Sequence, residues 1–217
     1  MPVRTASQDS SGRRALGALR LAAEVALVTL AFIAASIMHG GTLTWHMIIH
    51  IALMNIAAPW VAWNLLHVQR GSKGEGKLYV SLSLATAGQL VIFCFWHTPL
   101  GMAAMTGFDI IRLLAMGTLF ASAVWFWLSV FVSIRQGRIT AIFPLLLTGK
   151  IFCLIAAILV FAPRLLYTDM PPLAAAMTDQ QLAGLIMLTA CPLTYVGASI
   201  IILARWYNAL ADRAETA

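Results

Sequence analysis

All five histidines in this 217-residue chain lie at the ends of long apolar segments. His46 and His50 are four positions apart, so on a helix they share one face, about a turn apart. His39 comes shortly before them, and His97 follows the third apolar segment. Neutral imidazole is a good ligand for copper or zinc. His46, His50 and His97 could therefore supply three nitrogen ligands to one metal ion.

Sulfur-containing residues accompany these histidines. Met54 continues the stripe of His46 and His50 by another turn, and Cys94 precedes His97 by three positions. Thioether and thiolate groups favour soft metal ions such as Cu(I), so Met54 and Cys94 are candidate auxiliary ligands. The imidazole of His39 is a third candidate. The alternative is that these side chains simply pack in an apolar interior, or lie at a membrane interface that suits their shape.

The composition predicts that lipid is the solvent for these residues. The chain is 61% hydrophobic and 10% charged, whereas soluble domains carry about 25% charged residues. Each apolar run suits a helix that crosses a hydrocarbon layer about 30 Å thick, and none alternates as a barrel strand would. We expect an all-α bundle of about six transmembrane helices. The expected spans are Leu19–Met38, Met47–Leu66, Tyr79–Trp96, Ile110–Val132, Ala141–Ala162 and Leu182–Ala204.

The positive charges predict the orientation of these spans. Eleven of the fourteen Lys and Arg residues fall in the N-terminal segment, the second and fourth loops and the C-terminal segment. These parts belong in the cytoplasm by the positive-inside rule. We therefore expect cytoplasmic tails at 1–18 and 208–217 around a membrane domain at 19–207, with His39, His46, His50 and His97 at the external face. Topology thus accounts for the net charge of +6, so no nucleic acid is expected as a partner.

Two further polar residues stand out. Lys150 lies near the middle of the fifth span, where a charge costs at least about 2.5–3.5 kcal/mol, so we expect it to face the bundle interior or a water-filled cavity. Its role could be structural or functional. Asp179 precedes the sixth span from outside; it suits a helix N-terminus, and it could also contribute to a polar external site.

Three motifs resemble those of the CtaG family of cytochrome oxidase assembly factors, a multi-span family named for the caa-type oxidases. They are H-M-x-x-H-x-x-L-M at 46–54 with a following A-P, W-H-x-P at 96–99, and D-Q-Q-x-x-G-x-x-M at 179–187. The family's further histidine pair before the fourth span and its Phe-Trp-Trp-Pro run are absent. The chain therefore resembles a divergent member.

The resemblance implies a function in maturing a haem–copper oxidase, with His46, His50, His97 and Asp179 in the site. The protein would then be a copper-handling chaperone of the respiratory chain and not an enzyme. It would be a multi-pass protein of the bacterial inner membrane, with the oxidase catalytic subunit or other assembly factors as partners. Alternatives are a haem-binding subunit with axial histidines, a metal-free structural subunit, and a small-solute transporter that uses Lys150.

Overall fold

The computed structural model describes residues 42–68, 81–107, 109–167 and 176–215, together with the isolated positions 17, 19, 23 and 25. The predicted first span lies outside the described residues apart from three of those isolated positions. His39 and the part of the second loop after Val68 also lie outside them.

Every regular element of the described residues is a helix. The elements in chain order are α2 (Leu43–Ile51), the π-helix η1 (Ala52–Ala57), α3 (Ala58–Val68), α4 (Leu82–Trp96), α5 (Pro99–Gly107), α6 (Asp109–Arg135), the short 3₁₀-helix η2 (Ile139–Ala141), α7 (Ile142–Phe161) and α8 (Ala176–Glu215). The predicted all-α class is confirmed.

Four of the described helical segments are long and apolar enough to cross a membrane, and they coincide with predicted spans. They are Leu43–His67, Asp109–Arg135, Ile139–Phe161 and Ala176–Ala214. The shorter apolar helix α4 coincides with the predicted third span. The chain is thus a multi-pass membrane protein built as a helix bundle.

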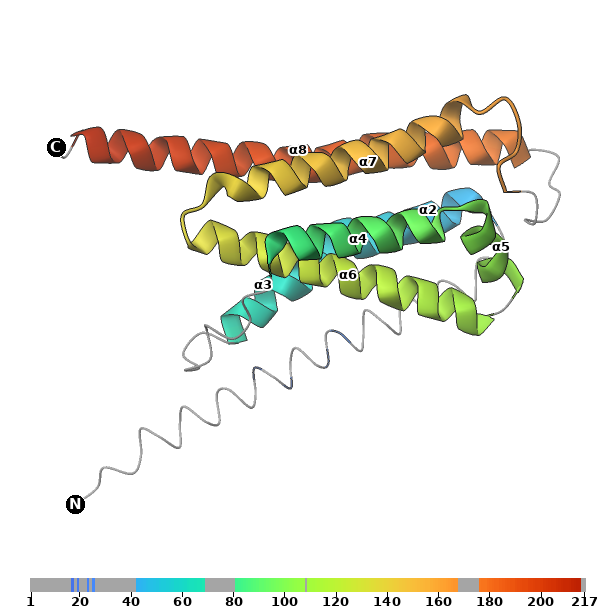
Figure 1. The fold of residues 1–217 in the computed structure, drawn as a ribbon, viewed down its shortest axis with the longest axis horizontal. Helices are drawn as coiled ribbons and strands as arrows, with labels where there is room; N and C mark the ends of the chain where they lie inside the picture. Colours follow the sequence, from blue (N-terminus) through green and yellow to red (C-terminus); the bar gives the residue numbers. More distant parts are fainter. Residues whose placement is uncertain are drawn as a thin grey trace, which may run out of the picture.

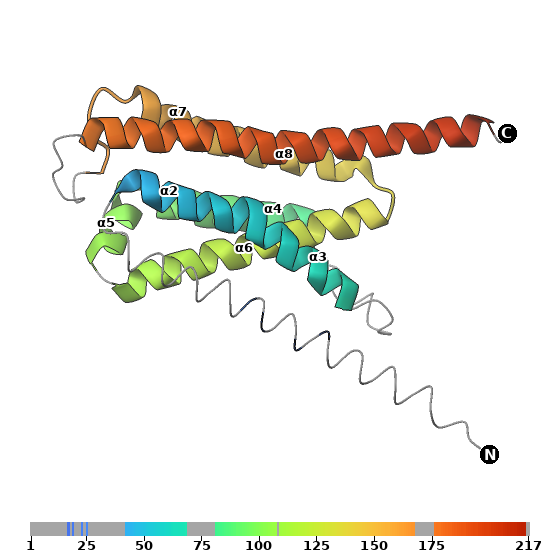
Figure 2. The same ribbon diagram turned by 180° about the vertical axis from the view of Figure 1, so that it is seen from behind.

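The helices lie roughly along one direction, so their ends gather at the two ends of the bundle (Figure 1). Helix α8 packs against α7 on one side and α2 on the other, while α6 packs against α3 and α4. Seen from behind, α2 lies between α8 and α6, and α3 turns away from α8 (Figure 2). The beginning of α2, helix α5 and the end of α7 meet at one end of the bundle (Figure 1).

Helix α8 approaches α7 closely at Gly184. A Cβ atom added there would lie 2.8 Å from the Val160 side chain and 2.9 Å from the Ala156 carbonyl oxygen. Because membrane helices gain little from the hydrophobic effect, close backbone approach at small residues is a main source of their association. This contact fixes the position of the first turns of α8 relative to the end of α7.

Lys150 does not point into the described bundle, which corrects the expectation drawn from its depth. Its side chain is exposed on α7, whereas Thr148 and Gly149 are buried. A helix turns about 100° per residue, so the inward position of Thr148 places Lys150, two residues later, on the opposite side. The cost of a charge in hydrocarbon therefore falls on the outer surface of α7, where the long lysine stem can carry the ammonium group toward an interface.

Candidate functional site

The histidine residues of the predicted site come from the ends of two helices. Helix α2 begins at Leu43, where the Thr42 hydroxyl accepts a hydrogen bond from the Trp45 amide (3.3 Å). His46 and His50 follow on successive turns. His97 directly follows α4, and its ring contacts that of His50. The predicted convergence of these three residues is therefore present in the fold.

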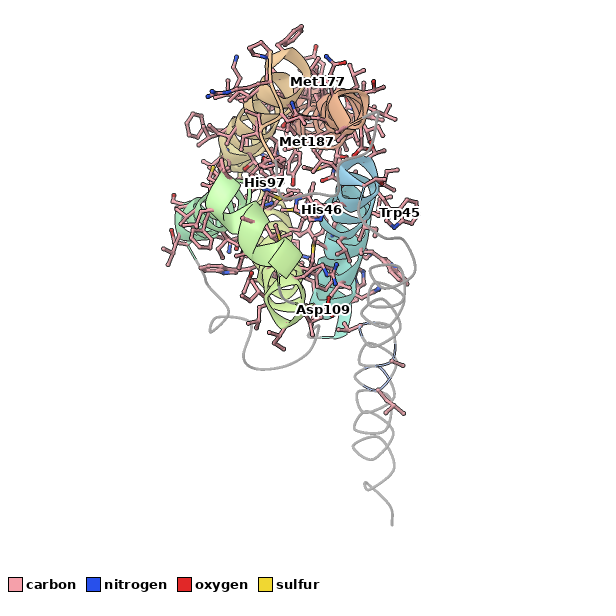
Figure 3. The ribbon with its side chains drawn as sticks, turned by 90° about the vertical axis from the view of Figure 1, so that its right-hand side faces the viewer. Trp45, His46, His97, Asp109, Met177 and Met187 are labelled. Carbon is pink, nitrogen blue, oxygen red and sulfur yellow. The ribbon has the colours of Figure 1, made fainter. Side chains whose placement is uncertain are left out.

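The three imidazole rings form a contiguous group. The centres of the His46 and His50 rings are 6.2 Å apart, and those of His50 and His97 are 5.1 Å apart. The Phe93 ring packs against the group: it stacks on the His97 ring, with 4.0 Å between the ring centres. In the end-on view of Figure 3, His46 and His97 lie toward the interior while Trp45 points outward.

Four ring nitrogens of this group are buried and have no hydrogen-bond partner among the described residues. They are Nε2 of His46, both nitrogens of His50, and Nε2 of His97. His50 and His97 are only 3% and 6% exposed. An unpartnered buried polar group costs about 1–3 kcal/mol, so this concentration at one place is unusual for a folded interior.

The orientation of His97 is set by a backbone hydrogen bond. Its Nδ1 lies 2.8 Å from the Phe93 carbonyl oxygen, which can only accept, so Nδ1 carries the proton. The lone pair of His97 is then on Nε2, which faces no partner. Burial lowers the pKa of His97 to about 4, despite the opposing effect of this hydrogen bond. The ring is therefore neutral at physiological pH, as a metal ligand must be.

The spacing of the rings suits ligands of one shared metal ion, but their nitrogen atoms do not point to a common position. Two imidazoles that share an ion through bonds of about 2 Å have ring centres roughly 5–6 Å apart. Both measured spacings lie near that range. The His46 and His50 rings are nearly parallel, at 12°. No group of three His, Cys, Asp or Glu side chains in the described ranges is already arranged around a metal position, so coordination requires side-chain rotation.

Asp179 is joined to the helix that carries His46 and His50. Its carboxylate accepts hydrogen bonds from the amides of Leu43 (2.7 Å) and Thr44 (3.2 Å), and its carbonyl oxygen accepts one from the Thr44 hydroxyl (3.0 Å). These amides belong to the first turn of α2, where four N–H groups lack helical partners. The carboxylate also complements the positive end of the helix dipole.

The candidate auxiliary ligands occupy different environments. Met54 is 1% exposed and lies in η1, the π-helix that follows α2. Cys94 is exposed, so it is not among the buried side chains of the histidine group. His39 lies outside the described residues. Of the three predicted auxiliaries, Met54 is therefore the one that the structure places in the core.

The sequence patterns did not predict the π-helix η1, which begins two residues after His50. Its extra residue per turn disturbs the backbone hydrogen bonds, and the Trp127 indole donates to the Met54 carbonyl oxygen (3.1 Å). Short π-helices often occur at functional sites. Pro59 was the available signal, because proline has no N–H for the carbonyl four residues earlier.

The sequence patterns also did not predict helix α5. Thr98 and Pro99 form a helix start that the sequence contains: the Thr98 hydroxyl accepts a hydrogen bond from the Gly101 amide (3.1 Å), and Pro99 is the first helical residue. A Cβ at Gly101 would lie 2.6 Å from the Phe95 carbonyl oxygen. The sharp turn between α4 and α5, which carries His97, therefore requires a glycine there.

Comparison with known proteins gives one result. The family model described as cytochrome c oxidase caa3 assembly factor matches residues 76–209. This segment runs from before α4 into α8, so it contains His97 and Asp179, while His46 and His50 precede it. Neither a curated protein nor a solved structure matches the chain.

Proposed function

We propose, from the premise that this chain belongs to the family of cytochrome c oxidase caa3 assembly factors, that it handles copper for a haem–copper oxidase during assembly. In this proposal His46, His50 and His97 bind the ion at the external face of the bacterial inner membrane. The chain then passes the ion to the oxidase catalytic subunit, or to another assembly factor. The ion is cargo, and no covalent bond of a substrate is made or broken, so the protein acts as a metallochaperone and not as an enzyme.

The single observation that carries the proposal is the group of four buried imidazole nitrogens without partners. Imidazole lone pairs in an apolar interior bind a borderline or soft cation well, and copper ranks above the other first-row divalent metals for such ligands. A bound ion would also remove the cost of leaving these nitrogens unsatisfied.

Buried thioether groups on the same segment support copper over harder cations. Met47 and Met54 are 0% and 1% exposed, and they flank His50 along α2 and η1. Thioether sulfur prefers Cu(I) to calcium, magnesium or manganese. A site in which two or three imidazoles hold the ion, with methionines nearby, suits an ion that must later be released.

The haem alternative with His50 and His97 as axial ligands fits this geometry less well. Two axial histidines lie on opposite faces of a porphyrin, so their ring centres are at least about 6 Å apart when each metal–nitrogen bond is about 2 Å. The centres of the His50 and His97 rings are 5.1 Å apart and meet edge-on. A porphyrin would have to separate rings that are in contact. A metal-free structural subunit remains the second candidate, and the experiment below separates it from the first.

The test measures copper bound to the purified protein after Cu(I) loading, together with oxidase activity in the producing cells. His50→Ala is compared with His67→Ala, which removes a histidine at the other end of the same span. We expect His50→Ala to lose the copper and lower oxidase activity, while His67→Ala retains both. Equal amounts of copper in the two variants would contradict the proposed site. If the purified protein holds neither copper nor haem, and deleting it still lowers oxidase activity, the structural subunit is favoured.

A further inference from the structure

Gln180 is a buried side chain in the first turns of α8 whose amide group makes three hydrogen bonds. It is 2% exposed. Its amide nitrogen donates to the carbonyl oxygens of Leu159 (3.2 Å) and Arg164 (3.4 Å), and its amide oxygen accepts from the Leu166 amide (2.8 Å). These groups belong to the end of α7 and the segment that follows it. One side chain therefore fixes the path of that segment.

The segment that Gln180 holds leads directly to His97. Tyr167 follows Leu166, and its hydroxyl donates a hydrogen bond to the His97 carbonyl oxygen (2.9 Å). A carbonyl oxygen can only accept a hydrogen bond, so the Tyr167 hydroxyl is the donor. Gln180 is thus connected to His97 by two hydrogen bonds: Gln180 accepts one from the Leu166 amide, and Tyr167, the next residue, donates the other to His97.

The neighbouring residue, Asp179, is bonded to the other histidine-bearing element. Its carboxylate holds the first turn of α2, which leads into His46 and His50. Successive residues on a helix point about 100° apart. Two adjacent side chains of α8 therefore reach two different parts of the chain: α2, and the segment at the end of α7.

We propose that Asp179 and Gln180 are a pair of positioning residues: Asp179 sets the placement of His46 and His50, and Gln180 sets that of His97 through Tyr167. The inference rests on the proposed function for its purpose, because it explains how one turn of α8 brings ligands from two helices to a common position. Neither residue touches the ion.

The test uses the metal-free protein and compares the two arms. Diethylpyrocarbonate acylates accessible neutral imidazoles, and mass spectrometry reports each histidine separately, with His67 as internal reference. Asp179→Ala should raise acylation of His46 and His50 about fivefold, the factor expected from loss of one helix cap, and leave His97 unchanged. Gln180→Met should raise acylation of His97 and leave the other two unchanged.

A third variant and two controls separate positioning from general loosening. Tyr167→Phe deletes only the hydroxyl, and it should raise acylation of His97 by about fivefold, as for one hydrogen bond. Gln181→Met alters the exposed neighbour of Gln180, and Asp109→Ala removes an exposed carboxylate at the start of α6. Both controls should behave as the unchanged protein.

Each outcome bears on one idea only. Arm-specific acylation supports the positioning pair, even if the unchanged protein binds no copper and the proposed function fails. The inference is overturned if either α8 variant raises acylation of all three histidines by the same factor over the unchanged protein. It is also overturned if neither variant raises acylation of any of them. Both results count whether or not copper binds. If Asp179→Ala fails to fold, Tyr167→Phe and Gln180→Met decide the matter through the His97 arm.

Discussion

The imidazole ring of His50 meets that of His97 edge-on, with 5.1 Å between the ring centres and an angle of 67° between the ring planes. The two residues come from different helices, and each has a buried nitrogen without a partner among the described residues. This contact joins the α2 half of the histidine group to the α4 half.

The contact predicts non-additive loss of copper. Removing an outer partner of a metal ligand costs about 10–100-fold in affinity, so removing a ligand itself should cost at least about 100-fold. We expect His50→Ala and His97→Ala each to weaken Cu(I) binding by this amount. The variant with both substitutions should bind Cu(I) with the same affinity as either single variant. Competition with a Cu(I) chelator measures the affinities. Independent, multiplying losses would indicate two separate sites.

The π-helix η1 should depend on Trp127. Trp127→Phe removes the hydrogen bond to the Met54 carbonyl and should cost about 1 kcal/mol in the free energy of unfolding. Trp125→Phe is the matched control, since no hydrogen bond of the Trp125 indole is found among the described residues. Hydrogen exchange of the amides at 55–58 should accelerate only in Trp127→Phe. Equal exchange in both variants would show that the π-helix stands without this bond.

The close approach of α7 and α8 predicts opposite effects of one substitution at two glycines. A Cβ at Gly184 would meet three atoms of α7 at 3.0 Å or less, whereas a Cβ at Gly197 would meet nothing within 4 Å. Gly184→Ala should therefore destabilise the protein by about 1–3 kcal/mol. Gly197→Ala should be neutral or stabilise by up to about 1 kcal/mol, because alanine favours helix. Thermal unfolding in detergent compares them, and a stable Gly184→Ala would contradict the contact.

The exposed position of Lys150 predicts that leucine is tolerated there. A lysine near the bilayer centre costs about 2.5–3.5 kcal/mol on insertion scales, and a leucine costs nothing. Lys150→Leu should raise thermal stability in liposomes and leave copper binding unchanged. Lys150→Arg, which keeps the charge, is the control. A fall in stability with leucine alone would reveal a polar neighbour of Lys150 inside the membrane.

Orientation in the membrane remains a prediction from the positive charges. Reporters fused after residues 75 and 137 should be active as cytoplasmic fusions, and those after 104 and 170 as external fusions. Labelling of Ser72→Cys by a membrane-impermeant reagent from outside would reverse the assignment. The histidine group would then open to the cytoplasm.

The helices and the histidine group could be foreseen from the sequence, but the facing of α7 could not. Long apolar runs fix where membrane helices lie, and the spacing of His46 and His50 fixes their common face. Helix α7 is apolar on nearly all sides, so its pattern does not say which side faces the bundle, and Lys150 was assigned by its depth alone. The polar neighbour Thr148 and the small Gly149, both buried, were the better guide.

The bonds of Asp179 and Gln180 were beyond sequence reasoning for a different reason. Asp179 suits the start of its own helix, and the charge pattern does not reveal that it serves the start of another. The three hydrogen-bond partners of Gln180 are all backbone groups, which every sequence contains. Only the placement of α8 beside α2 and α7 makes these contacts.

Helix α8 is longer than any bilayer requires. Its 40 residues extend about 60 Å, against a hydrocarbon core of about 30 Å. Every described side chain from Leu203 to Ala214 is exposed, so the last turns stand apart from the rest of the bundle. The chain therefore carries a built-in spacer. A fluorescent protein or affinity handle joined to its end would be held well away from the lipid headgroups, which makes this terminus a convenient attachment point for measuring how α8 tilts.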